Sequence, residues 1–150
     1  MFIQIVTGSA LMLISILSGV LSVWGMEIAF QRFHDWLMRE PHRTKLLLVV
    51  MLAALWVLAI VTAGVWVWAL AFYALAIFDT MEASVYFALV SFTTLGYGDV
   101  LLPKEWRILG GMAAANGLLT IGLLTAILVE TLRHVRLEQV QTRRSRRKQD

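Results

Sequence analysis

Three long stretches without any charged residue dominate the pattern of this chain: residues 2–26, 46–78 and 108–129. A helix needs about 20 mainly apolar residues to cross a hydrocarbon core of about 30 Å, and each stretch is long enough. Three such segments in 150 residues leave too little polar sequence to enclose them in a soluble core. The pattern therefore predicts an all-α membrane protein with three transmembrane helices.

The composition agrees and excludes several classes of function. Hydrophobic residues make up 59% of the chain and charged residues 15%, whereas a soluble domain has about 25% charged residues. The absence of cysteine excludes disulfides and thiolate metal sites. The three histidines are scattered without metal-ligand spacing, and the sequence offers no nucleophile–base set. We expect neither an enzyme nor a nucleic-acid partner.

The charges between the apolar stretches predict an orientation. Residues 27–45 contain four Lys and Arg, residues 79–107 contain two, and the tail from residue 130 contains seven. Lys and Arg collect on the cytoplasmic side of membrane proteins. We therefore expect the N-terminus and the 79–107 connection outside, and the 27–45 connection and the C-terminus in the cytoplasm.

The 27–45 connection has a helical pattern of its own. Apolar residues recur at helical spacing: Met26, Phe30, Phe33 and Leu37. The connection is either an amphipathic helix in the membrane interface or a continuation of the first helix beyond the bilayer. In both cases Pro41 is expected to end the helix.

The 79–107 connection contains an apolar segment, residues 83–94, that is too short to cross a membrane. Asp79 and Glu82 suggest a capping box at the start of a short helix. Gly96 and Gly98 are expected to break that helix, after which the chain continues as extended backbone. Non-helical backbone at membrane depth is tolerated only where it is buried in protein or lines a watery path. These features predict a re-entrant helix followed by an extended strand whose carbonyls face a cation.

The segment TTLGYGD (residues 93–99), placed between two apolar spans, resembles the pore domain of potassium channels, whose signature is T-V-G-Y-G. The resemblance covers residues 46–130 and implies an outer helix 46–78, a pore helix 80–93, a filter 94–99 and an inner helix 107–130. Residues 117–129, GLLTIGLLTAILV, resemble the inner helix of small bacterial potassium channels. It follows that the fold would be assembled as a fourfold homotetramer, in the cytoplasmic membrane of a bacterium.

The resemblance also implies roles for individual residues. Potassium ions, the only ligand implied, would bind in the filter to Thr94, Leu95, Gly96, Tyr97 and Gly98. Asp99 would lie at the outer mouth, where Tyr86 could donate a hydrogen bond to it. Candidates for the cavity or a hinge are Thr93, Asn116, Gly117 and Gly122. For Gly117, a gating hinge and close helix packing remain equal alternatives.

Two parts of the chain depart from that pore unit. Residues 1–26 form an extra N-terminal helix without the recurring arginines of a voltage sensor. The tail, residues 131–150, carries a basic cluster that could bind anionic lipid headgroups: Arg143, Arg144, Arg146, Arg147 and Lys148.

Alternatives to a potassium-selective channel also remain. Leu95 stands where the family usually has valine, so a less selective monovalent cation channel of the same fold is the first of them. A membrane scaffold or lipid-binding protein is a second, although it would need neither the GYGD sequence nor a re-entrant segment.

Overall fold

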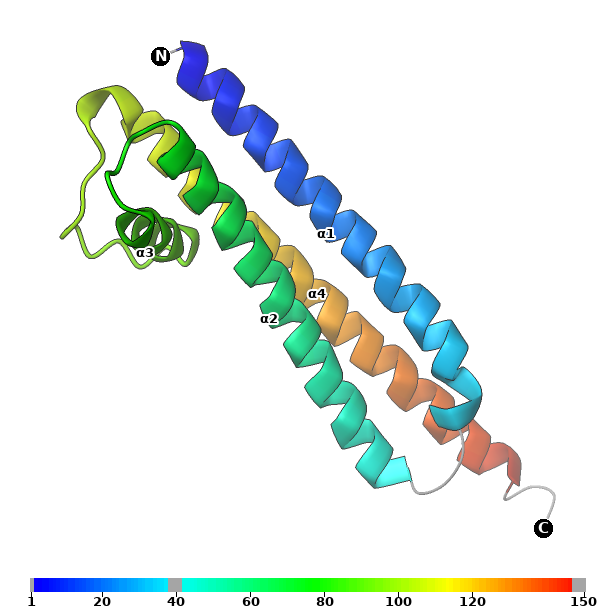
Figure 1. Cartoon of the computed structure of the whole chain (residues 1–150). Coiled ribbons are helices and arrows are strands. Elements are labelled where there is room, and N and C mark those ends of the chain that lie inside the picture. Colours follow the sequence, from blue (N-terminus) through cyan, green and yellow to red (C-terminus); the bar gives the residue numbers. More distant parts are fainter. Residues whose placement is uncertain (1, 38–41, 147–150) are drawn as a thin grey trace.

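The computed structural model describes residues 2–37 and 42–146, and this part of the chain is helical with no β-strand. The elements are α1 (Phe2–Leu37), α2 (His42–Ala74), α3 (Met81–Phe92), the 3-10 turn η1 (Lys104–Trp106) and α4 (Arg107–Arg146). Three long helices lie side by side, and a short helix packs against two of them, α2 and α4, near one end (Figure 1).

Each long helix contains a segment that is long and apolar enough to cross a membrane: Phe2–Ser22, Leu47–Ala74 and Lys104–Glu130. Each of the three predicted spans is thus part of a helix that could cross a membrane by its length and composition. The N-terminus lies at the end of the bundle that carries α3, and the C-terminus lies at the opposite end (Figure 1). Which end faces the cytoplasm stays a prediction from the basic residues.

The helices at both ends of the chain extend beyond the apolar stretches. α1 continues to Leu37 as one helix, so residues 27–37 of the connection continue the first helix. Residues 42–45 belong to α2, which begins at His42 and not at residue 46 as expected. Pro41 lies outside the described residues. α4 continues to Arg146, whereas the inner helix was expected to end at residue 130. Charge ends a membrane span but not a helix, because Arg, Glu and Gln are good helix formers and neither glycine nor proline follows Gly122.

The second long helix ends earlier than its apolar sequence predicted, at Ala74 rather than at residue 78. Ala76 has a left-handed backbone (φ 51°), and its N–H donates to the Tyr73 carbonyl oxygen at 2.9 Å. The Ile77 N–H donates to the Phe72 carbonyl oxygen at 3.1 Å, which completes a Schellman cap. Because the capping residue is alanine and not glycine, the sequence carried no stop signal here.

The start of α3 also differs by one residue from the predicted capping box. Thr80, not Asp79, is the N-cap, and its side-chain oxygen accepts a hydrogen bond from the Ala83 N–H at 3.2 Å. This bond satisfies one of the free donors of the first turn. Glu82 lies within that turn, where the helix dipole favours a negative charge.

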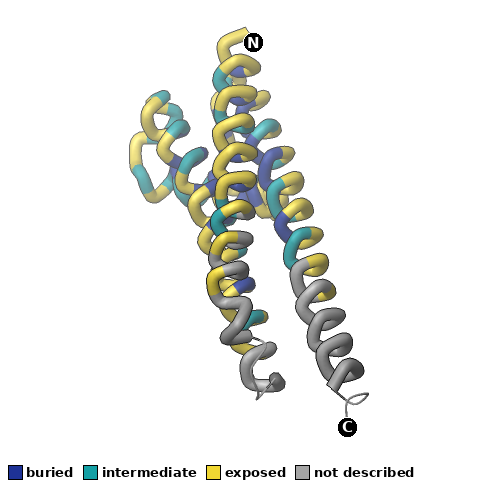
Figure 2. Tube along the Cα trace, turned by 90° about the vertical axis from the view of Figure 1, so that its right-hand side faces the viewer, coloured by how far each residue is buried: buried dark blue, intermediate teal, exposed yellow. Residues whose placement is uncertain are grey.

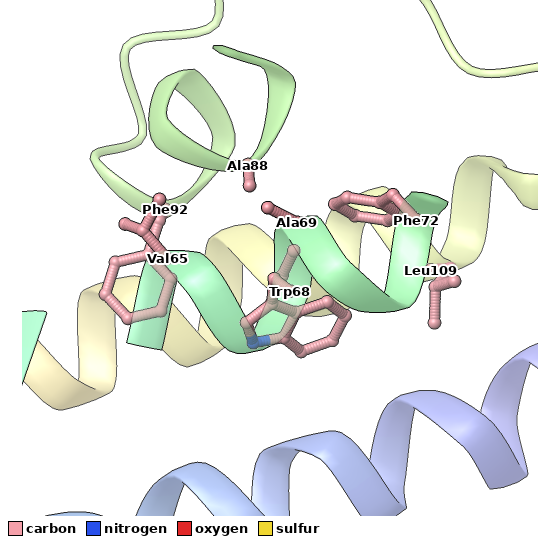
Figure 3. Close-up of a cluster of buried hydrophobic side chains, with 8 residues drawn as sticks. Val65, Trp68, Ala69, Phe72, Ala88, Phe92 and Leu109 are labelled. Atoms are coloured by element: carbon pink, nitrogen blue, oxygen red, sulfur yellow. The ribbon is translucent and has the colours of Figure 1, made fainter. Parts of the chain in front are cut away.

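The hydrophobic core lies where α2, α3 and α4 meet (Figure 3). It consists of Val65, Trp68, Ala69 and Phe72 from α2, Ala88 and Phe92 from α3, and Leu109 and Ala113 from α4. α1 packs mainly along α4, and its Leu11 and Met12 contact this core. Most of the described side chains of α1 are exposed, as Figure 2 shows, which suits a helix that faces lipid.

The last residue of α3 is held between two glycines. A Cβ added to Gly64 of α2 would lie 2.8 Å from the Phe92 ring. One added to Gly117 of α4 would lie 2.6 Å from the Phe92 Cα and would meet the Phe92 carbonyl oxygen more closely still. The structure therefore shows a packing role for Gly117, because only a residue without a side chain allows α4 to approach the backbone of α3 this closely.

We expect Gly117→Ala to destabilise the protein, because the added methyl group would overlap with backbone atoms that cannot rotate away. Overpacking of this kind costs about 1–3 kcal/mol. Denaturant titration of the purified chain in mild detergent measures the loss. Gly19→Ala is the matched control, since a Cβ there meets nothing within 4 Å and alanine is the better helix former by about 1 kcal/mol. A Gly117→Ala protein as stable as the parent would contradict the packing role.

Candidate functional site

The chain leaves α3 as an exposed loop with an unusual backbone, residues 93–99, here called the TTLGYGD loop. Within it, three alternate residues have positive φ angles: Thr94 at 59°, Gly96 at 55° and Gly98 at 77°. When all residues of an extended segment have negative φ, successive carbonyls point to opposite sides. When negative and positive φ alternate, successive carbonyls can point to the same side. Glycine adopts positive φ at little cost, which accounts for two of the three positions.

The start of the loop is fixed by hydrogen bonds to the end of α3. Thr94 takes the left-handed position of a Schellman cap, with its N–H donating to the Ser91 carbonyl oxygen at 2.9 Å. The Leu95 N–H donates to the Val90 carbonyl oxygen at 3.0 Å. A β-branched residue rarely adopts this conformation, so Thr94 stores local strain of about 1–3 kcal/mol. The first turn of the loop is therefore set by α3.

The rest of the loop lacks cover in the single chain. All seven residues are exposed, including Leu95 at 56% and Tyr97 at 69%. Residues 94–98, which are predicted from the sequence to bind ions, lie together in this exposed loop. The candidate cation ligands are their backbone carbonyls and the Thr94 hydroxyl. Among the side chains that the structure describes, no group of three or more His, Asp or Glu is placed to hold a metal ion.

The far end of the loop is attached to α3 by a side-chain hydrogen bond. The Tyr86 hydroxyl donates to Asp99 Oδ2 at 2.5 Å, which confirms the predicted pairing. The Val100 N–H donates to Asp99 Oδ1 at 3.0 Å. The bond from Tyr86 lowers the pKa of Asp99, because it stabilises the carboxylate, and it raises the pKa of Tyr86. Both ends of the loop are thus anchored to the same short helix.

The residues predicted for a cavity or hinge fall into different environments. Thr93 is exposed, and its hydroxyl donates to the Leu89 carbonyl oxygen at 2.8 Å. Asn116 is fully buried inside the subunit, so it does not lie on the exposed face of α4. Gly117 packs against Phe92, whereas a Cβ at Gly122 would meet nothing within 4 Å. Gly117 is in contact with Phe92, the last residue of α3 before the TTLGYGD loop.

Three residues of the basic cluster, Arg143, Arg144 and Arg146, belong to the last turns of α4, and Arg147 and Lys148 lie outside the described residues. Gly64 and Phe92 support the loop but were not predicted from the sequence. A glycine in the middle of an otherwise continuous apolar helix was the one available signal for such a close approach.

Comparisons with known proteins bear on this arrangement. A sequence model of a family described as "Ion channel" matches residues 46–134, more than half of the chain. The chain is also similar to the potassium voltage-gated channel protein shk-1 of Caenorhabditis elegans, with 41% identity over 58 residues. That stretch is 38% of this chain, and it spans about a tenth (11%) of the length of the relative. No solved structure matches the chain.

We expect Tyr86→Phe to raise the pKa of Asp99, because the carboxylate loses the hydrogen bond that stabilises its charged form. The bond stabilises the loop at neutral pH, and its contribution is lost as the pH falls through the lowered pKa of Asp99. A titration of the Asp99 carboxyl carbon by NMR measures the change. Tyr73→Phe, an exposed position on α2, is the control. An unchanged Asp99 titration in Tyr86→Phe would show that the bond does not persist in solution.

Proposed function

The chain is an integral membrane protein that belongs to this ion channel family, and from that premise we propose that it is a subunit of a potassium-selective channel. Family membership implies a protein that is not an enzyme. The observation that carries the potassium assignment is the exposed loop backbone with alternating φ at Thr94, Gly96 and Gly98. A row of carbonyl oxygens on one side of such a strand can replace the hydration shell of a potassium ion.

The position of α3 supports a filter in this loop. α3 crosses α2 and α4 and ends at the residue next to the loop (Figure 1). The C-terminal end of a helix carries a partial negative charge, which stabilises a nearby cation. In this proposal α3 is a re-entrant pore helix, the TTLGYGD loop is the selectivity filter, and α2 and α4 are the outer and inner helices.

The exposure of the loop supports assembly into a tetramer. Polar backbone cannot face lipid, so the loop has to be covered by protein or has to line a water-filled path. One chain supplies a single strand, which cannot enclose an ion. A closed ring of identical subunits solves both problems, because the loops line a common axis while the helices face outward. We infer that four copies form this ring.

The orientation follows from the basic residues and the bundle geometry. The tail after α4 would be cytoplasmic, and the N-terminus and the loop would lie outside, in a bacterial cytoplasmic membrane. The basic cluster near the C-terminus would then face the inner leaflet and could bind anionic lipids.

One feature favours a second candidate, a less selective monovalent cation channel. Leu95 occupies a central position of the loop and is 56% exposed in the single chain. Leucine is more flexible at χ1 than the β-branched valine expected there, so the loop could hold its carbonyls less rigidly.

Selectivity decides between these two functions. We expect the purified protein in planar bilayers to give a reversal potential that follows the potassium gradient and not the sodium gradient. Gly98→Ala should abolish conduction, because alanine at φ 77° is strained and the carbonyl row would be disturbed. Gly19→Ala is the control and should conduct normally. Near-equal permeability to the two ions would favour the less selective channel.

Chemical cross-linking tests the assembly independently of ion flux. In mild detergent, the product ladder of the full chain should end at four copies, since a ring of four loops is the closed unit. Gly98→Ala should give the same ladder, because the substitution is confined to the exposed loop. A conducting preparation whose ladder ends at two copies would refute the fourfold ring.

A further inference from the structure

Four buried side chains in the long helices have polar atoms without a hydrogen-bond partner among the described residues. One is Gln4 Oε1, near the start of α1, and the other three are Ser15 Oγ of α1, Trp68 Nε1 of α2, and both amide atoms of Asn116 in α4. Ser15 is 3% exposed, and Trp68 and Asn116 are fully buried. Such groups are rare in proteins, and within a membrane no bulk water can satisfy them. Three of them on three adjoining helices call for one explanation.

Helix register places Ser15 and Asn116 at the same level. Near the start of both helices, a Cβ added to Gly8 of α1 would contact Leu109 and Met112 of α4. The two helices run in the same direction from that contact (Figure 1). Ser15 follows Gly8 by seven residues, and Asn116 follows Leu109 by seven, which is about two turns and 10 Å along each axis.

Trp68 belongs to the same level from the side of α2. Phe92 contacts Gly64 and Gly117, so these two glycines lie at one height on helices that run in opposite directions. Trp68 is one turn beyond Gly64 toward the end that carries α3, and Asn116 is one residue from Gly117 in that same direction. Figure 3 shows the Trp68 indole on the opposite side of α2 from α3. Leu11 and Met12 of α1 pack against the core to which Trp68 belongs.

We propose that Ser15, Trp68 and Asn116 form one buried polar junction that fastens α1 to α2 and α4. The donors and acceptors are complementary, since the indole N–H only donates, the amide donates and accepts, and the hydroxyl does both. A rotation of the Asn116 amide, or one water molecule held by two or three of these groups, closes the hydrogen bonds.

Such a junction provides the kind of contact through which membrane helices associate. Lipid tails are as apolar as leucine, so burial of apolar surface does not hold α1 in place. Helix association in a bilayer depends on close packing at small residues and on hydrogen bonds between helices. The interface supplies the first at Gly8, which lies against Met112. For the second, Ser15 and Asn116 offer the buried polar atoms that the proposed junction pairs.

The junction also bears on conduction, and this part of the inference rests on the proposed channel function. Asn116 directly precedes Gly117, the residue that abuts the Phe92 backbone at the start of the TTLGYGD loop. By holding α4 at this level, α1 fixes the support of the loop. Weakening the junction should therefore change how often the channel opens and leave the choice of ion unchanged.

Double-mutant cycles on the full chain test the junction without any measurement of ion flux. Ser15→Ala and Asn116→Leu remove the polar atoms with little change of shape. Trp68→Phe removes the indole N–H together with part of the ring, and the double-mutant cycle separates this loss of packing from the coupling. In detergent unfolding titrations, Asn116→Leu should couple to each of the other two by about threefold in the unfolding constant, a usual value for hydrogen bonds between membrane helices. Ser9→Ala, an exposed serine on α1, should show no coupling to Asn116→Leu. Independent effects at all three positions would overturn the junction.

Disulfide trapping reports the position of α1 directly, because the chain has no cysteine of its own. Gly8→Cys with Met112→Cys should oxidise readily, and the rate should fall severalfold when Asn116→Leu is added. An unchanged rate would show that Asn116 does not hold α1. If coupling and trapping behave as expected but the open probability in bilayers does not change, the fastening stands and its part in opening is refuted. Failure of the parent protein to conduct would refute the channel function alone.

Discussion

Every polar group of a backbone that lies within a membrane has to find a partner, and the architecture of this chain depends on that constraint. Three long helices meet it internally, since their N–H and carbonyl groups pair within each helix. The TTLGYGD loop does not meet it in this way. Its seven successive residues are exposed after the chain has left α3, and in the described structure only the first N–H groups of the loop donate to α3 carbonyls. In the proposed channel, neighbouring copies cover this segment and potassium ions are the polar ligands of its carbonyls.

The loop is held in place by contacts with α3 and by the helices behind α3. Phe92 is seated between glycines of α2 and α4, so the start of the loop is tied to both long helices. Tyr86 holds the other end through Asp99. The strain of a left-handed Thr94 is sustained because the Schellman cap and the seated Phe92 fix the backbone on either side. Small shifts of α4 at Gly117 would therefore reach the loop through rigid contacts and not through flexible side chains.

The extra helix α1 belongs to the same construction. It packs along α4, where Gly8 admits the Met112 side chain, and its exposed surface suits lipid. In the proposed tetramer α1 would stand behind the inner helix of its own subunit. Its buried serine is then better understood as part of a polar contact with α4 than as a tolerated defect.

The sequence alone determined the features that depend on local pattern. Charge-free stretches set three spans, because the length of an apolar run is all that a membrane helix needs. Gly96 and Gly98 marked the loop, and the Tyr86–Asp99 pair was anticipated from the resemblance. Local pattern was less informative where alanine and threonine took the left-handed cap positions that glycine usually marks, so the end of α2 was placed four residues too late.

Only the tertiary structure decided how the helices meet. It assigned Gly117 to packing against Phe92, buried Asn116 inside the subunit and placed α1 against α4. An apolar helix looks alike on all sides in sequence, so the pattern cannot show which face meets a partner. That choice is made by the shapes of side chains on helices distant in sequence, and it becomes visible only when those helices are packed together.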